Sequence, residues 1–130
     1  MIRRTARALG ALLIASAGVA APAARIGGQD PDWTAPPAAA AKSNPLAGRR
    51  ETAAGGAKLF QIRCASCHGA DGRGTSKGPD LRDTAVQAQT DGALFWKLTT
   101  GNTRAGMPTF SFLREPQRWQ LVLYLRNRGD

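Results

Sequence analysis

The chain has 130 residues, a length that suits one domain with additional segments. Its 18 Lys and Arg residues outnumber the 9 Asp and Glu residues, so the formal net charge is +9. A basic balance can indicate nucleic-acid binding, but here the positive residues are dispersed and lie partly in a removable N-terminal stretch. We therefore expect no nucleic-acid partner, whereas a mildly basic domain favours an acidic protein partner at modest ionic strength.

Residues 1–23 have the pattern of a secretory signal peptide. Three arginines within the first seven residues precede an apolar stretch from Ala8 to Ala20, and Ala21-Pro22-Ala23 fits a small-residue cleavage site. A membrane-spanning helix needs about 20 apolar residues, and this stretch is shorter. We expect cleavage and a periplasmic location. The alternative is an uncleaved anchor that holds the protein at the membrane, facing the periplasm.

Residues 24–50 are predicted to be a linker rich in proline and alanine. Pro36 and Pro37 are followed by four alanines, and no apolar period is present. Such a segment buries too little surface to offset the entropy lost on ordering. Trp33 is the exception, because its ring either docks on the neighbouring domain or stays exposed.

A domain is predicted over residues 51–130, and its first helix begins with Thr52 as N-cap and runs toward Cys64. Gly56, Leu59, Phe60 and Arg63 have the spacing of one helix face. A glycine lowers helix propensity, but it allows another helix to approach closely.

Both cysteines and the only histidine of the chain lie in one motif, Cys64-Ala65-Ser66-Cys67-His68. This C-x-x-C-H spacing is the attachment signature of c-type haem. Two thiols on a tight turn can each add to one haem vinyl group, and His68 then lies under the iron as an axial ligand. The alternatives are a structural disulfide, a thioredoxin-like redox pair or half of a zinc site. The chain lacks further Cys or His residues for zinc, and no βαβ pattern surrounds the motif.

A loop rich in glycine follows His68 and continues to Leu81. It lacks the Gly-Lys-Ser/Thr ending of a phosphate-binding loop. We expect it to wrap one side of a flat cofactor.

Two more helices are predicted. The first starts at Thr90-Asp91-Gly92 and ends at Gly101, and the last has Pro116 in its first turn and Gly129 at its end. A buried strand over 121–125 is the alternative to the last helix. No strand pattern is convincing elsewhere, so the expected class is all-α.

Met107 is the only methionine apart from the start residue, and it lies in a loop before Pro108. Its thioether is a soft ligand that could complete the coordination of a haem iron already bound by His68. A role as a core or exposed loop residue is the alternative.

Together these residues resemble the class I c-type cytochromes, in particular small bacterial monohaem members. The resemblance covers about residues 51–130 and rests on the Cys-x-x-Cys-His, Gly-Pro-x-Leu and Met-Pro motifs in that order. It implies a fold of three to five helices around one covalent haem c, with crossing N- and C-terminal helices. In the family, a first-helix glycine and aromatic residue, here Gly56 and Phe60, cross a Leu and aromatic pair, here Leu121 and Tyr124.

The resemblance also implies the site. Cys64 and Cys67 would carry the thioethers, His68 and Met107 would be the axial ligands, and the Pro79 carbonyl would accept the His68 N–H. Leu81 and Phe110 would pack near the haem. Candidates for binding the propionates are Trp96, Asn102 and Arg104.

The implied function is that of a one-electron carrier and not an enzyme. We expect a monomer that shuttles electrons between a dehydrogenase or quinol-oxidising complex and a terminal oxidase. The alternative is a dedicated cytochrome c subunit that accepts electrons from one dehydrogenase within a complex. The basic residues expected to steer an acidic partner are Arg63, Arg73, Lys77 and Arg104.

Overall fold

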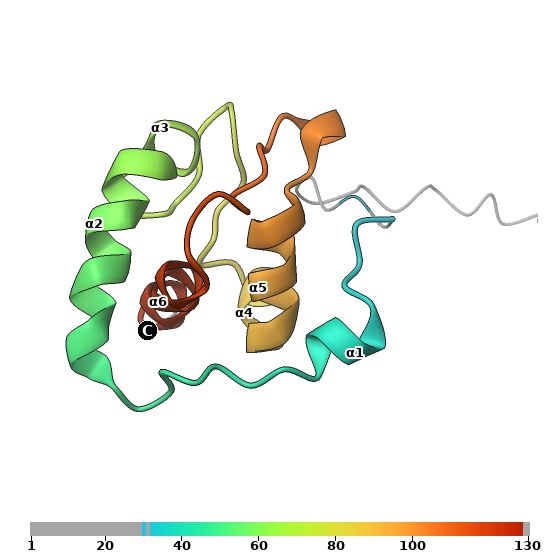
Figure 1. Cartoon of the computed structure of the whole chain (residues 1–130). Helices are drawn as coiled ribbons and strands as arrows, with labels where there is room; N and C mark the ends of the chain where they lie inside the picture. Colours follow the sequence, from blue (N-terminus) through green and yellow to red (C-terminus); the bar gives the residue numbers. More distant parts are fainter. Residues whose placement is uncertain (1–29, 31, 129–130) are drawn as a thin grey trace, which may run out of the picture.

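The structure, a computed structural model, describes residues 30 and 32–128. Helices α2 (Ala53–Arg63) and α6 (Glu115–Arg126) pack together, and helix α5 (Asp91–Thr100) lies on the other side of α6 (Figure 1). The shorter elements are α1 (Pro37–Ala40), α3 (Ala65–His68), α4 (Thr84–Gln87) and two 3-10 turns, Arg50–Thr52 and Thr103–Ala105. These described residues contain no β-strand, and the predicted all-α class is confirmed.

Helices α2 and α6 approach each other at Gly56. A Cβ atom on this glycine would lie 2.1 Å from the backbone oxygen of Gln120, so only glycine fits. One turn further along α2, the rings of Phe60 and Tyr124 pack with their centroids 5.1 Å apart. The expected close crossing of the two helices is therefore present, and the two aromatic side chains form its apolar centre.

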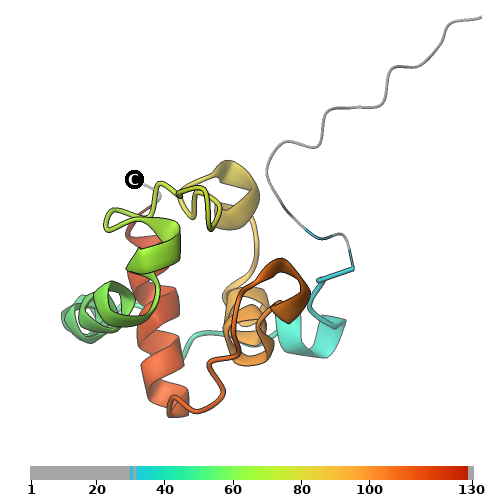
Figure 2. The same cartoon turned by 90° about the horizontal axis from the view of Figure 1, so that it is seen from above.

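Helix α6 lies between α2 and α5, as both views show (Figures 1 and 2), and this position explains the continuous apolar run in its second half. All five residues from Leu121 to Leu125 are buried. Trp119, one turn earlier, stacks on Phe95 of α5 with ring centroids 4.0 Å apart. The alternative of a strand over 121–125 is wrong. The helix ends at Arg126, and the predicted end at Gly129 lies outside the described residues.

The end signals of α5 are confirmed. The Thr90 hydroxyl accepts a hydrogen bond from the Ala93 N–H (3.1 Å), and Gly101 ends the helix with a positive φ of 64°. Thr52 does not cap α2 in this way. It continues from a 3-10 turn with helical backbone angles, and its hydroxyl donates to the Arg49 carbonyl instead (2.8 Å).

The described part of residues 24–50, hereafter the N-terminal segment (30 and 32–50), packs on the domain, which corrects the expectation of a linker without packed structure. A Cβ atom on Gly92 of α5 would lie 2.2 Å from the Ala39 carbonyl oxygen, so the backbones of α1 and α5 are in close contact. Asn44 is 5% exposed and donates to the Trp119 carbonyl (3.2 Å). These contacts use backbone carbonyls and an amide, so no apolar period marks them in the sequence.

The predicted signal peptide, residues 1–23, lies outside the described residues. Within the described part of the chain, no helix combines the length and apolar character needed to cross a membrane.

Candidate haem site

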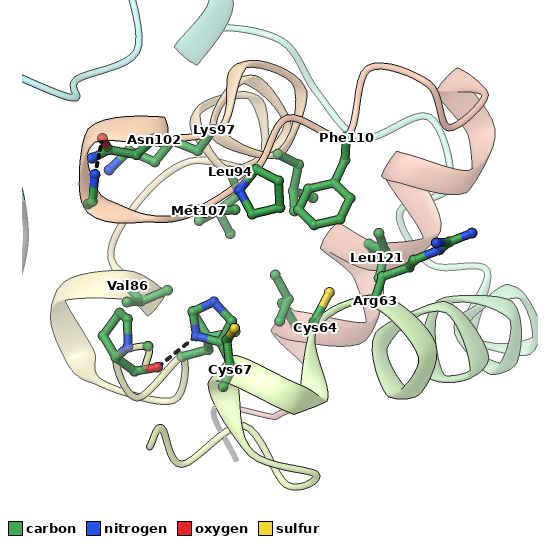
Figure 3. A pocket seen from close by; sticks show the side chains of 18 of the residues that line it. Arg63, Cys64, Cys67, Val86, Leu94, Lys97, Asn102, Met107, Phe110 and Leu121 are labelled. Atoms are coloured by element: carbon green, nitrogen blue, oxygen red, sulfur yellow. Dashed lines mark hydrogen bonds between the residues drawn. The ribbon is translucent and has the colours of Figure 1, made fainter. Parts of the chain in front are cut away.

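An open pocket lies between the α3 region and the segment that follows α5. Its empty volume, including solvent at its mouth, is about 1280 Å³. Figure 3 shows Cys64 and Cys67 on one side of this space and Met107 on the other. The apolar lining side chains come from every long helix and include the two expected there, Leu81 and Phe110; the others are Phe60, Val86, Leu94, Leu98, Leu121 and Leu125.

The two cysteines reach the pocket from the junction of α2 and α3, hereafter the cysteine turn: Cys64 lies between the two helices and Cys67 lies in α3. Cys64 ends α2, with its N–H donating to the Phe60 carbonyl (2.8 Å), and its own carbonyl accepts from the His68 N–H (2.9 Å). Both thiols are free, so they do not form a disulfide. Burial, together with the neighbouring Cys67, raises the pKa of Cys64 to about 11.

A raised thiol pKa argues against a thioredoxin-like redox pair, which needs a readily formed thiolate. The zinc alternative fails as well, because the described residues contain no group of three or more metal-binding side chains.

The loop after His68 contacts the imidazole through Gly78 and Pro79. The His68 Nδ1 lies 2.9 Å from the Pro79 carbonyl oxygen, which fixes Nδ1 as the protonated nitrogen when the ring is neutral. Gly78 packs against the same ring, since a Cβ atom there would lie 3.1 Å from it. The Thr75 hydroxyl donates to the Cys67 carbonyl (2.6 Å) and ties the loop to the cysteine turn. The unprotonated Nε2 is thereby left available to a metal.

Met107 is positioned by a short backbone turn after α5. Asn102 and Met107 exchange two backbone hydrogen bonds of 2.9 Å each, around the 3-10 turn Thr103–Ala105. The Phe110 N–H then donates to the Leu98 carbonyl (3.0 Å) and returns the chain to α5. The Met107 side chain is half-buried and lines the pocket.

The three candidates for binding propionates do not share one location. Asn102 lines the pocket, whereas Trp96 and Arg104 do not. Trp33 and Lys97 are among the lining residues that were not predicted from the sequence, and the Lys97 Nζ lies 4.6 Å from the centre of the Trp33 ring. Burial lowers the pKa of Lys97. The only sequence signal for this pair was the isolated tryptophan in a segment of prolines and alanines.

The four basic residues expected to steer a partner do not all lie at the pocket. Arg63 and Lys77 line the pocket, and Arg73 and Arg104 do not. The Arg63 guanidinium lies 5.4 Å from the ring centre of Phe112, an exposed side chain. Positive charge and exposed apolar surface therefore meet beside the cysteine turn.

The residues present fit a haem. The cavity is lined mainly by apolar side chains, two free thiols lie on one side, and an imidazole with one nitrogen already engaged lies beside them. Cys64, Cys67, His68, Pro79 and Met107, although up to 43 positions apart in the chain, all line this one pocket.

Known proteins agree with this fit. Residues 51–125 match the family model described as cytochrome c oxidase, cbb3-type, subunit III. Among solved structures, cytochrome cL from the marine methylotrophic bacterium Methylophaga aminisulfidivorans is similar, with a TM-score of 0.57 and 24% sequence identity. That match covers 65% of this chain and 60% of the cytochrome cL chain, and it supports the fold alone. A search of curated proteins gives no match. The chain belongs to the c-type cytochrome family of the cbb3-type subunit III model, and its cofactor is a covalently attached haem c.

Proposed function

We propose that the chain is a one-electron carrier in which Cys64 and Cys67 bind haem c and His68 and Met107 are its axial ligands. One observation carries the proposal most directly. His68 and Met107 line the same pocket, and the Pro79 carbonyl already engages one of the two His68 ring nitrogens, Nδ1. Haem c supplies a one-electron Fe(III)/Fe(II) couple when bound.

The Pro79 carbonyl would set both the orientation and the basicity of His68. Its hydrogen bond to Nδ1 keeps the neutral ring in one tautomer and increases the electron density at Nε2. Gly78 supports this arrangement, because a larger residue would displace the loop from the ring. The loop 69–81 therefore acts as a rigid support for the ligand.

Two protein ligands would leave no open coordination position for a substrate or gas. A methionine ligand favours the reduced iron, and an apolar lining disfavours the extra charge of the oxidised iron. Both effects raise the reduction potential, which suits a carrier that accepts an electron and passes it on.

Arg63 and Lys77 would attract an acidic redox partner to the pocket mouth. Both side chains are exposed, so salt screens their effect. We infer a periplasmic location from the predicted signal peptide, with the membrane-anchored form as the alternative. The partner would be a dehydrogenase, a quinol-oxidising complex or a terminal oxidase. The carrier itself would be a monomer.

A dedicated subunit is the second candidate, because the matching family model is described as a subunit of an oxidase. A stable complex with one enzyme that survives purification from the native membrane would favour it. Electron exchange with several unrelated partners by the free monomer would favour the shuttle.

Mass and absorption spectra of the purified protein test the proposal. We expect a covalent haem and, in the oxidised protein, a methionine–iron charge-transfer band that Met107→Ala removes. The exposed neighbour Thr109 supplies the control, since Thr109→Ala should keep the band. A protein without covalent haem, or a band that persists in Met107→Ala, would refute the assignment.

A further inference from the structure

The turn that carries Met107 has little packing of its own. Residues 103–106 and 108–109 are all exposed, and Met107 itself is half-buried. The turn joins the rest of the domain at its two ends, through Asn102 and Phe110, which are both buried. A segment with few buried contacts opens at low cost in free energy. A metal ligand on this turn therefore depends on support at the ends of the turn.

Asn102 closes the turn with its backbone and with its side chain. Its backbone N–H donates to the Met107 carbonyl, and its own carbonyl accepts from the Met107 N–H, at 2.9 Å each. Its side-chain Oδ1 accepts from the Ala105 N–H (3.3 Å). Figure 3 shows Asn102 and Met107 on the same side of the pocket, across from Cys67. The orientation of the Asn102 amide therefore fixes the path of the chain from α5 to Met107.

The nitrogen of the same amide donates to the N-terminal segment. The Asn102 Nδ2 lies 3.3 Å from one carboxylate oxygen of Asp30, a residue 72 positions earlier in the chain. Asn102 is 8% exposed, and a buried amide that loses its acceptor costs free energy. The hydrogen bond to Asp30 thus stabilises the one orientation of Asn102 that also closes the Met107 turn.

The Asp30 carboxylate is itself held in place. Its second oxygen accepts from the Asp32 N–H (3.0 Å), and the Asp30 carbonyl accepts from the Trp33 N–H (3.0 Å). The Trp33 ring packs on α5, with the Lys97 Nζ 4.6 Å from its centre. An acceptor that is already ordered costs little additional entropy when it binds its donor. The docked segment therefore presents a fixed carboxylate to Asn102.

We propose that Asp30 is a positioning residue for Met107: its carboxylate, through Asn102, holds the turn closed and keeps the methionine sulfur on the iron. The inference rests on the proposed axial ligation by Met107. It gives a function to the N-terminal segment, which lies outside the family match at residues 51–125. When the segment is docked, the iron resists foreign ligands, and when it detaches, the turn opens and the methionine is readily displaced.

Titration of the oxidised, full-length holoprotein with imidazole tests this role. Imidazole replaces the methionine when the turn opens: one Fe–S bond breaks, one Fe–N bond forms, the iron stays Fe(III), and the methionine–iron band disappears. Asp30→Ala should raise the affinity for imidazole about fivefold, the effect of one lost hydrogen bond of ordinary strength. A variant with the wild-type affinity would overturn the proposal.

Asp32→Ala is the matched control. It removes the same charge from the same segment, but the Asp32 side chain is exposed and its backbone N–H, which donates to Asp30, is retained. We expect the wild-type affinity for imidazole. If Asp32→Ala raised the affinity as much as Asp30→Ala, the net charge of the segment would be the cause, and the positioning role of Asp30 would be wrong.

A double-mutant cycle tests whether Asp30 acts through Asn102. Asn102→Ala should also raise the affinity for imidazole, since it removes the side chain that closes the turn. Adding Asp30→Ala to this variant should then have no further effect, because the carboxylate has lost its donor. Two effects that multiply in the double variant would contradict the proposed route.

The coupling must also operate in the opposite direction, because linkage between two sites is reciprocal. Saturating imidazole should accelerate hydrogen exchange at the Trp33 backbone N–H, which donates to the Asp30 carbonyl. This measurement needs no variant. A Trp33 exchange rate that imidazole leaves unchanged would show that the segment and the turn move independently, against the proposal.

The outcomes separate the two claims. A wild-type holoprotein without a methionine–iron band refutes the axial assignment of Met107. A wild-type holoprotein that has the band, together with an Asp30→Ala variant of equal affinity for imidazole, refutes the positioning role alone.

Discussion

Two contacts in this protein have nearly the same geometry but different consequences. At Gly56 a Cβ atom would lie 2.1 Å from the Gln120 carbonyl oxygen, and at Gly92 it would lie 2.2 Å from the Ala39 carbonyl oxygen. The first contact joins two long helices around Phe60 and other fully buried side chains. The second joins α5 to α1, a helix of four residues in the N-terminal segment. None of the residues of α1 is buried.

The difference teaches that a close backbone contact does not by itself show how strongly two segments are held together. The crossing of α2 and α6 is supported by apolar burial, which scales with the area removed from water. The N-terminal segment relies on hydrogen bonds such as the one from the Thr90 hydroxyl to the Ala40 carbonyl (2.7 Å). We therefore expect the segment to detach at lower cost than the helices separate.

Gly56→Ala should have the largest effect. The new methyl group would meet backbone atoms of Gln120, which cannot move away without separating α2 from α6. We expect a loss of about 3 kcal/mol in the free energy of unfolding, measured by urea denaturation of the holoprotein. Gly55→Ala is the matched control, because its methyl would meet only the flexible Gln120 side chain. Equal stability of the two variants would contradict the crossing.

Gly92→Ala should rank second, with a loss of about 2 kcal/mol. The added methyl group would displace α1, while α2 and α6 keep their contact. Hydrogen exchange should accelerate within residues 32–50 and stay unchanged in α6. Uniform acceleration throughout the protein would show that the segment and the domain unfold as one unit.

Asn44→Ala should cost about 1 kcal/mol. Asn44 is buried, and its side chain donates to the Trp119 carbonyl and accepts from the Leu46 N–H (2.9 Å). Thermal unfolding of the holoprotein measures the loss of stability. Ser43→Ala is the control, because Ser43 is the exposed neighbour of Asn44. If both variants unfolded at the wild-type temperature, Asn44 would not fasten the segment.

Asp71→Asn should have the smallest effect. Asp71 pairs with Arg73 at 3.0 Å, but their side chains are 55% and 67% exposed, and exposed ion pairs add little stability. We expect an unchanged urea midpoint for the holoprotein. A clear decrease would mean that the loop after His68 depends on this pair rather than on its contacts with Cys67 and His68.

The sequence predicted the parts of the fold that local signals encode. The Thr90 cap, the Gly101 end and the apolar run of α6 each reflect a preference within a few residues. The close approach at Gly56 was expected from the family resemblance. Cys64, Cys67 and His68 were predicted from one compact and unusual motif, Met107 because it is the only methionine after the start residue, and Pro79 from the family resemblance.

The packing of the N-terminal segment was not predicted, for a physical reason. Its contacts join residues 50 to 75 positions apart through carbonyl groups, which every residue carries. No side-chain pattern encodes such a contact. The contact between the Trp33 ring and the Lys97 ammonium group was missed because the two residues are far apart in the chain and meet only where the segment folds back over α5.

The central claim is that one pocket holds the haem iron between His68 and Met107. The most direct test is the proton NMR spectrum of the reduced holoprotein. We predict that the Met107 methyl resonance is shifted far upfield, because it lies over the haem ring, and that Met107→Leu removes it. A Met107 methyl resonance at the ordinary chemical shift of a methionine methyl group would contradict the claim.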